Sequence, residues 1–281
     1  MPESRPTVLS IAGYDPSSGA GVTADIKTIA AHGCFGVTCI TALTVQSTQG
    51  VRRVQAVEGR LVAETLEELA NDIGVSAVRI GMLASGEVAE AVAEFLGRAR
   101  LQNVPDPPLP NSGRYGAPWV VLDPILRSSS GTDLLDERGI EVVRTRLIQL
   151  ADVVTPNMEE AAALSGVKVQ SLFGMKKAAA KLQEMGARAV VITGGHLKEP
   201  VDLLSVGRKQ MEFAGKRIES NATHGTGCAF ATALACNLAR GIDLKDSVRA
   251  AGQYVRRAIA RAYPVGRGKG PINHLYGMRE A

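Results

Sequence analysis

The sequence predicts an α/β protein of three layers (α/β/α), with helices on both faces of a mostly parallel central sheet. Two observations predict this fold class. Short apolar segments alternate with longer segments of helical periodicity, and helical connections of ten or more residues imply right-handed crossovers between parallel strands. The apolar segments are also nearly continuous, as in WVVLD at 119–123, which is typical of strands buried on both faces.

The expected elements follow from where apolar residues run together and where they recur every three to four positions. Strands are predicted at 7–13, 36–46, 75–81, 119–123, 152–155 and 187–195. Helices are predicted at 21–33, 58–74, 85–100, 133–151, 157–166, 173–186, 226–240 and 244–262. The segments 201–207 and 209–215 are expected to form a hairpin.

Two of these helices carry clear boundary signals. Helix 21–33 places Val22, Ile26 and Ile29 on one face, and Gly33 ends it. Helix 157–166 has acidic residues in its first turn, where the helix dipole favours negative charge.

One irregular segment, 102–118, contains five prolines. We interpret it as a surface loop inserted between a helix and a strand. A domain linker is the alternative, but the alternation of strands and helices resumes unchanged after it. A single domain over residues 1–281 is therefore expected.

Composition argues against several classes of protein. The net charge of +4 is spread along the chain and aromatic residues make up 4%, which gives nucleic-acid binding little support. No apolar segment approaches the roughly 18–20 residues that span a membrane, and the N-terminus does not read as a signal peptide. The cysteines at 34, 39, 228 and 236 form no CxxC pair and the histidines are scattered, so free thiols in the cytoplasm are expected rather than a zinc site.

The most informative stretch is NATHGTGCAFATALACNLARG at 221–241. A glycine turn that leads into a helix offers unpaired N–H groups and partial positive charge to an anion. The Rossmann fingerprint fails here because Phe230 occupies its third glycine position, and no Walker P-loop occurs in the chain. A tight turn that only packs the helix against a strand is the alternative.

Cys228 stands in the first turn of that helix. The helix dipole and nearby N–H groups are expected to lower the pKa of its thiol. Such a group could take a proton from a hydroxyl while the N–H groups hold charge on a transferring phosphoryl group. An inert buried cysteine is the alternative.

A second polar stretch, AGYDPSSGAGVTADIKT, covers residues 12–28. It lies at the carboxyl end of the first predicted strand, and ligands bind at that edge in open α/β sheets. Asp25 lies in the first turns of the following helix, where it could bind a ligand or only complement the helix dipole.

These motifs together resemble one family. The chain contains, in the family's order, AGYDPSSGAGVTADIKT, VTCITALTVQST, IGML, VVLDPIL, TPNMEEAAAL, ITGGH, NATHGTGCAFATALA and GKGPINH. The sequence resembles the hydroxymethylpyrimidine/phosphomethylpyrimidine kinases of thiamin biosynthesis, of the ribokinase-like superfamily, from about residue 7 to residue 275. The resemblance implies a ribokinase-like fold without a separate lid domain, a small aminopyrimidine substrate, ATP and Mg²⁺ as cofactors, and a homodimer.

The resemblance also assigns roles to residues. An anion hole is implied, with Cys228 near the attacking oxygen as general base: Gly225, Thr226, Gly227 and Cys228. Substrate contacts are implied for Gly13, Ala20, Asp25, Gln46, Met82 and Ile125. Nucleotide phosphate contacts are implied for Asn157, Gly195 and His224, and Mg²⁺ with its waters for Asp123 and Glu160. Thr193 and Arg127 are also expected on the phosphate side, although neither is the residue that the family usually has.

Three residues depart from the family pattern. Thr193 stands where the family usually has a lysine that would contact phosphate as a point charge. Arg127 stands where a small or apolar residue is usual, and could replace that charge, bind the phosphate of a phosphorylated substrate, or be a solvated loop residue. Tyr14 could cover the pyrimidine ring.

The function expected from the resemblance is phosphorylation of the hydroxymethyl arm of an aminopyrimidine, of its monophosphate, or of both. Thr193 and Arg127 suggest that the second step is the better one, which turnover on alcohol and monophosphate would test. Pyridoxal kinase is the nearest alternative. A pyrimidine-binding protein without catalysis is a third possibility, and a dehydratase of the same fold would have aspartate in place of Cys228.

Overall fold

A computed structural model describes residues 5–102, 117–128 and 130–278 of the chain. Within these ranges nine strands form one sheet in the order β3-β2-β1-β4-β5-β6-β7-β8-β9. The strands are β1 Thr7–Tyr14, β2 Phe35–Ser47, β3 Gly50–Ala56, β4 Ala77–Ile80, β5 Trp119–Leu122, β6 Val153–Val154, β7 Ala189–Ile192, β8 Val201–Val206 and β9 Lys209–Ala214.

The middle of the sheet is parallel, from β2 through β1, β4, β5 and β6 to β7. Two antiparallel hairpins flank it, because β3 returns along β2, and β8 and β9 follow β7 in an antiparallel meander. The predicted mostly parallel sheet and the predicted hairpin at 201–215 are therefore confirmed.

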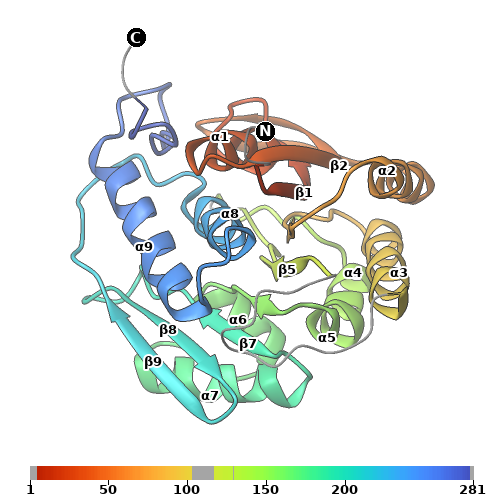
Figure 1. Cartoon of the computed structure of the whole chain (residues 1–281). Coiled ribbons are helices and arrows are strands. Elements are labelled where there is room, and N and C mark those ends of the chain that lie inside the picture. The colour runs from red at the N-terminus through yellow and green to blue at the C-terminus, as the bar shows by residue number, and fades with distance from the viewer. Residues whose placement is uncertain (1–4, 103–116, 129, 279–281) are drawn as a thin grey trace.

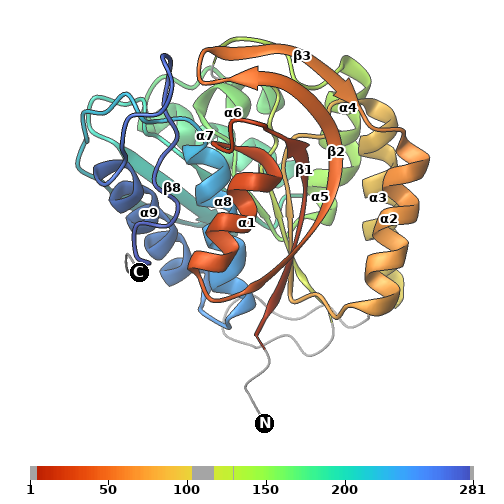
Figure 2. The same ribbon diagram turned by 90° about the horizontal axis from the view of Figure 1, so that it is seen from above.

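Helices cover both faces of the sheet (Figures 1 and 2). Helices α1, α8 and α9 lie on one face, and the other helices lie on the opposite face. Their bounds are α1 Gly21–Ala31, α2 Gly59–Asp72, α3 Gly86–Gln102, α4 Glu137–Val142, α5 Ile148–Leu150, α6 Met158–Ser165, α7 Leu172–Glu184, α8 Thr226–Ala239 and α9 Leu244–Ala260. A π-helical turn at Val143–Leu147 joins α4 to α5.

Each face of the sheet has its own apolar core. One contains Leu66 of α2 and Ile80 of β4, and the other contains Val191 of β7 and Leu234 of α8. Helix α8 is buried along almost its whole length and is rich in alanine, so it packs closely between the sheet and α9. This burial fixes the position of the helix N-terminus, where the HGTGC motif lies.

The structure differs from the predicted elements in two places, and a third prediction is not tested. The helix expected over 133–151 begins at Glu137, because Asp136 caps it by accepting a hydrogen bond from the Gly139 N–H. Strand β3 was not predicted, since its VRRVQA sequence has no apolar alternation, and only its half-buried Val51 and Val54 pack against an apolar cluster. The proline-rich loop predicted at 102–118 falls mainly on 103–116, outside the described residues.

The parallel strands bring their carboxyl ends to one edge of the sheet, and the N-terminus of α8 reaches the same edge. No helix in the described ranges is both long and apolar enough to cross a membrane.

Candidate active site

Two glycine loops meet at the carboxyl edge of the sheet. Gly225 has a φ of +82°, which a glycine adopts at little cost, and an added Cβ there would overlap the carbonyl oxygen of Gly19. A Cβ on Gly19 would in turn overlap the ring of His224. The loop at 15–20 and the loop before α8 are therefore in direct contact, although they are separated by about 200 positions in the chain.

Asp15 organises the first loop and joins it to the second. Its carboxylate accepts hydrogen bonds from the N–H groups of Ser17, Gly19 and Ala20 at 2.8–3.2 Å. Its Oδ2 also lies 2.8 Å from Nε2 of His224. Burial opposes the charged form, but the hydrogen bonds from His224 and Ser17 outweigh it and lower the pKa of Asp15.

Gln46 belongs to the same group, because its Nε2 lies 3.2 Å from Nε2 of His224. The structure thus brings together two residues expected to bind substrate, Ala20 and Gln46, and one expected to contact phosphate, His224. Here His224 contacts Asp15 and Gln46, so its side chain joins the loops.

A small apolar cluster lies at this edge, apart from the two cores. Buried Met82 is part of it and Ile125 packs against it. A Cβ on Gly13 would lie 3.0 Å from Sδ of Met82, so the glycine lets the backbone of β1 approach this side chain. Three of the residues expected to contact the substrate are thereby gathered where an aromatic ring could lie.

The N-terminus of α8 lacks a side-chain cap. Gly227 in its first turn is exposed and faces open space, with no atom within 4 Å of an added Cβ. The first N–H groups of a helix have no partner within the helix, so this end can receive the oxygens of a phosphoryl group.

The prediction of a lowered thiol pKa at Cys228 is wrong. Burial raises the pKa of Cys228 to about 12, and the nearby carboxylates Asp123 and Asp25 add to the effect, while Arg79 opposes it. The residue is only 8% exposed. Burial therefore outweighs the helix dipole, which by itself would lower the pKa of this thiol.

We expect Cys228 in the free protein to react slowly with iodoacetamide at pH 7.5, at less than about a tenth of the rate of an exposed cysteine, because the thiolate is the reactive form. Site-resolved mass spectrometry over time checks this. The rate should rise between pH 7.5 and 9.5 without levelling off. A plateau below pH 8 would show a thiolate already formed at neutral pH.

Arg79, which was not among the residues predicted for the site, lies at the centre of the charged groups. Its side chain is 0% exposed. Nη1 donates to Oδ2 of Asp25 at 3.0 Å and Nη2 donates to Oδ2 of Asp123 at 2.5 Å. The sequence did carry a signal, namely one arginine in the otherwise apolar strand β4, AVRI.

Asp25 is held entirely by protein groups in this structure. Besides Arg79, the hydroxyl of Ser10 donates to its Oδ2 at 2.6 Å and the hydroxyl of Thr232 donates to its Oδ1 at 2.7 Å. The residue is 0% exposed, so it lies behind the site surface. Direct contact between Asp25 and a ring stays a prediction.

Asn157 and Glu160 form a capping box at the start of α6. Oδ1 of Asn157 accepts from the Glu160 N–H at 2.9 Å, and Oε2 of Glu160 accepts from the Asn157 N–H at 2.9 Å. Burial, then the charge of Asp123, raises the pKa of Glu160 to about 8. The two carboxylates are thus close enough to repel each other.

This pair fits a divalent cation of the Mg²⁺ type. Such a cation binds through one or two carboxylates and completes its shell with water and substrate phosphates. In the described part of the chain no group of three or more His, Cys, Asp or Glu could hold a metal by itself. Asp123 and Glu160 therefore suit a cation that arrives with phosphate oxygens rather than one held in a protein cage.

The residues expected around nucleotide phosphates lie partly together. Thr193 pairs with Asn157 in a short parallel bridge, which places these two side by side. Arg217, also not predicted, donates from Nη2 to the carbonyl oxygens of Gly195 and Leu197. Arg217 therefore brings a guanidinium to the loop that follows Thr193.

Arg127 takes a different position. Its Nε lies 2.6 Å from Oδ1 of Asp133, and both side chains are exposed, at 68% and 71%. The pair is a solvated ion pair, and such pairs contribute little to stability.

His274, from the GPINH motif, is buried between α1 and α9. Its Nδ1 lies 3.1 Å from the hydroxyl of Thr28, and Tyr254 donates to its backbone oxygen at 2.7 Å. Burial, with the positive charge of Lys27, lowers the pKa of His274 to about 4. The imidazole therefore stays neutral in the folded protein at pH values where an exposed histidine takes a proton.

We expect this histidine to make the protein less stable in acid. Below pH 6.5 the unfolded chain binds a proton at position 274 that the folded chain does not bind until about pH 4. The free energy of unfolding therefore falls by up to about 3 kcal/mol as the pH falls through this range. Urea unfolding between pH 7.5 and 4.5 should show a smaller decline for His274→Gln, and equal declines would contradict this.

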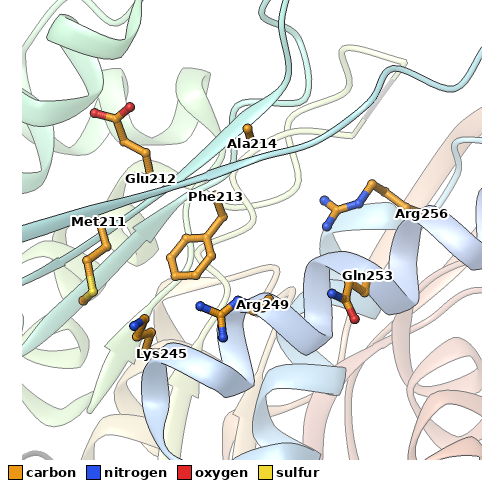
Figure 3. Close-up of a pocket in the computed structure, with 8 residues that line it drawn as sticks. All are labelled: Met211, Glu212, Phe213, Ala214, Lys245, Arg249, Gln253 and Arg256. Atoms are coloured by element: carbon orange, nitrogen blue, oxygen red, sulfur yellow. The ribbon is translucent and has the colours of Figure 1, made fainter.

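A groove elsewhere on the molecule lies between β9 and α9 (Figure 3), with a volume of about 550 Å³. It is lined by Met211, Glu212, Phe213, Ala214, Lys245, Arg249, Gln253 and Arg256. None of the residues predicted for the site lines this groove, so the candidate active site remains the carboxyl edge of the sheet.

Comparison with known proteins identifies the family of the chain. The family model described as phosphomethylpyrimidine kinase matches residues 15–113 and 109–273. A hydroxymethylpyrimidine/phosphomethylpyrimidine kinase of Streptomyces coelicolor is 39% identical over 99% of this chain and 98% of its own length. The thiamine biosynthesis bifunctional protein ThiED of Geobacter sulfurreducens is 39% identical over 98% of this chain, which spans 53% of that longer protein.

Among solved structures, the ADP complex of Bacillus subtilis pyridoxal kinase superposes with a TM-score of 0.83 at 30% identity. The match covers 96% of this chain and 98% of that one. The family match spans both glycine loops, the DP and N-x-x-E motifs and most of the GPINH segment, which are the elements that build the site. The chain belongs to the phosphomethylpyrimidine kinase family, whose members are phosphotransferases.

Proposed function

We propose that this protein transfers a phosphoryl group from ATP to the hydroxymethyl arm of 4-amino-5-hydroxymethyl-2-methylpyrimidine, to its monophosphate, or to both, in thiamin biosynthesis. The observation that carries the proposal is the uncapped N-terminus of α8, where Cys228 interacts with the carboxylate of Asp123, which in turn lies close to Glu160. The apolar cluster that contains Met82 lies against Gly13 at the carboxyl end of β1. Anion hole, acidic pair and ring-sized apolar surface are the three parts that such a transfer needs.

The pyrimidine would lie against Met82 and Ile125, with Gly13 allowing the ring close to β1. Gln46 offers amide groups for the ring nitrogens and the amino group, and it is fixed beside His224. Tyr14 is 37% exposed next to these residues, so it could cover the ring.

The phosphate side would be formed by the N–H groups of Thr226, Gly227 and Cys228. Asp123 and Glu160 would hold Mg²⁺, which supplies charge neutralisation to the phosphates when bound. The family usually has lysine at the position of Thr193. Arg217 supplies a cation beside the loop that follows Thr193, because its Nη2 donates to the carbonyl oxygen of Gly195. The exposed pair of Arg127 with Asp133 gives no support for a preference for the monophosphate.

Cys228 would lie beside the attacking hydroxyl. Because its thiol is protonated in the free protein, its service as a base requires that substrate binding first lowers its pKa. A neutral thiol still offers a weak hydrogen bond that can orient the hydroxyl.

Pyridoxal kinase activity is the second candidate, supported by the superposition on the Bacillus subtilis enzyme. Pyridoxal also carries a hydroxymethyl group on a six-membered aromatic ring, so the apolar cluster and the anion hole would suit it. The homodimer and the cytoplasmic location also stay predictions.

ADP release with ATP and Mg²⁺ tests the assignment, with the pyrimidine alcohol, its monophosphate and pyridoxal offered in parallel. We expect kcat/KM to be at least ten times higher for a pyrimidine than for pyridoxal. Turnover on pyridoxal alone would move the assignment to the second candidate. Pyrimidine binding without ADP release would show a binding protein.

A further inference from the structure

The guanidinium of Arg79 connects the two sides of the site. It contacts Asp25 of α1 through Nη1 and Asp123, directly after β5, through Nη2. The three residues come from separate elements and all are at most 5% exposed. The Cys228 thiol at the start of α8 also lies within the electrostatic influence of this guanidinium.

Stability does not explain this arrangement. Taking two carboxylates and a guanidinium out of water is costly, and apolar side chains of similar volume often serve a fold equally well. Arg79 also leaves its Nε without a hydrogen-bond partner in the described structure, and a buried unpaired donor costs on the order of 1–3 kcal/mol. Nη1 and Nη2 of Arg79 each donate to a carboxylate, while Nε has no hydrogen-bond acceptor among the described residues.

The neighbouring backbone is adapted to this side chain as well. A Cβ at Gly81 would overlap the guanidinium, so a larger residue there would displace it. Ser10 and Thr232 fix Asp25 from the other sides, so the position of the guanidinium is set at the Asp25 end. Nη2 of Arg79 then holds the carboxylate of Asp123 at the phosphate side of the site.

We infer that Arg79 is a positioning residue of phosphoryl transfer, which fixes Asp123 at the phosphate side against the anchored carboxylate of Asp25. The inference rests on the proposed function, since it assigns Asp123 to the phosphate side. Arg79 acts through the two carboxylates and does not itself touch a substrate.

The test compares Arg79→Met, Arg79→Gln and Arg79→Lys with native protein by melting temperature, kcat and the KM of each substrate. Arg79→Met and Arg79→Gln remove the charge, and the second serves if the first does not fold. We expect the neutral variants to lose kcat by about 100-fold, and Arg79→Lys to recover at least tenfold of that loss, because lysine restores one charged contact without the fork of arginine.

Arg188→Met is the matched control. Arg188 pairs with the buried Asp152 at 3.6 Å, at the opposite edge of the sheet. It should lower the melting temperature and leave kcat and both KM values within about twofold of native. This separates the loss of an ion pair to a buried aspartate from the loss of positioning.

A folded neutral variant with kcat within threefold of native would overturn the inference, as would Arg79→Lys failing to exceed the neutral variants. The kcat of each variant is compared with that of the native protein in the same assay. Native protein without turnover on pyrimidine or pyridoxal would instead refute the proposed function, and the inference with it.

Discussion

Gly225→Ala should abolish most of the activity and lower the stability of the protein. The substitution forces a non-glycine residue to a φ of +82°, and its Cβ would overlap the carbonyl oxygen of Gly19. The φ alone costs on the order of 1–2 kcal/mol, and the overlap must push the two glycine loops apart. We expect kcat/KM to fall by more than 100-fold, measured by ADP release, and the melting temperature to fall by several degrees.

Gly166→Ala is the control for the cost of placing alanine at a positive φ, without any overlap between loops. Gly166 ends α6 with a φ of +71°, and no atom lies within 4 Å of an added Cβ. The variant should be destabilised by about 1 kcal/mol with unchanged kcat/KM. If both variants behave alike, the contact between the loops does not matter for activity.

Asp123→Asn should reduce kcat by about 100- to 1,000-fold with a smaller change in the KM of the pyrimidine. The amide keeps the volume of the carboxylate but removes the negative charge that Arg79 contacts and that a divalent cation requires. Losses of this size are typical when a charged group that acts in the transition state is removed. Steady-state kinetics with saturating ATP and Mg²⁺ measure the effect.

Asp152→Asn is the matched control for a buried aspartate. Asp152 is fully buried and accepts a hydrogen bond from the Val120 N–H at 2.8 Å, at the edge of the sheet away from the site. It should lower the melting temperature and leave kcat within about twofold of native. A similar loss of kcat in both variants would mean that Asp123 acts only through stability.

The fold could be predicted to a large extent because its signals are local. Continuous apolar runs such as the one at Trp119–Leu122 and glycine helix ends such as Gly166 need no knowledge of distant residues. The position of the site followed from the same pattern, since parallel strands place their carboxyl ends at one edge. Strand β3 was not predicted because its two valines, Val51 and Val54, are three positions apart and do not alternate with polar residues as in a typical strand.

The charges of the site could not be predicted in the same way. The thiol of Cys228 begins a helix, which favours thiolate, but its burial and the carboxylates beside it come from distant parts of the chain. Arg79 was visible as a lone charge in an apolar strand, yet its partners Asp25 and Asp123 lie 54 and 44 positions away. Tertiary contacts decide both cases, and one sequence does not contain them in readable form.

Phosphorylation of a pyrimidine hydroxymethyl group is the central activity proposed for the carboxyl edge of this sheet. Phosphorus NMR of the native protein with ATP, Mg²⁺ and the pyrimidine alcohol, followed over time, tests it most directly. We predict new resonances of a pyrimidine phosphate ester, and of its diphosphate if both steps occur, and their absence with Asp123→Asn on the same timescale. ATP that remains intact, or is hydrolysed to free phosphate with no pyrimidine ester formed, would contradict the claim.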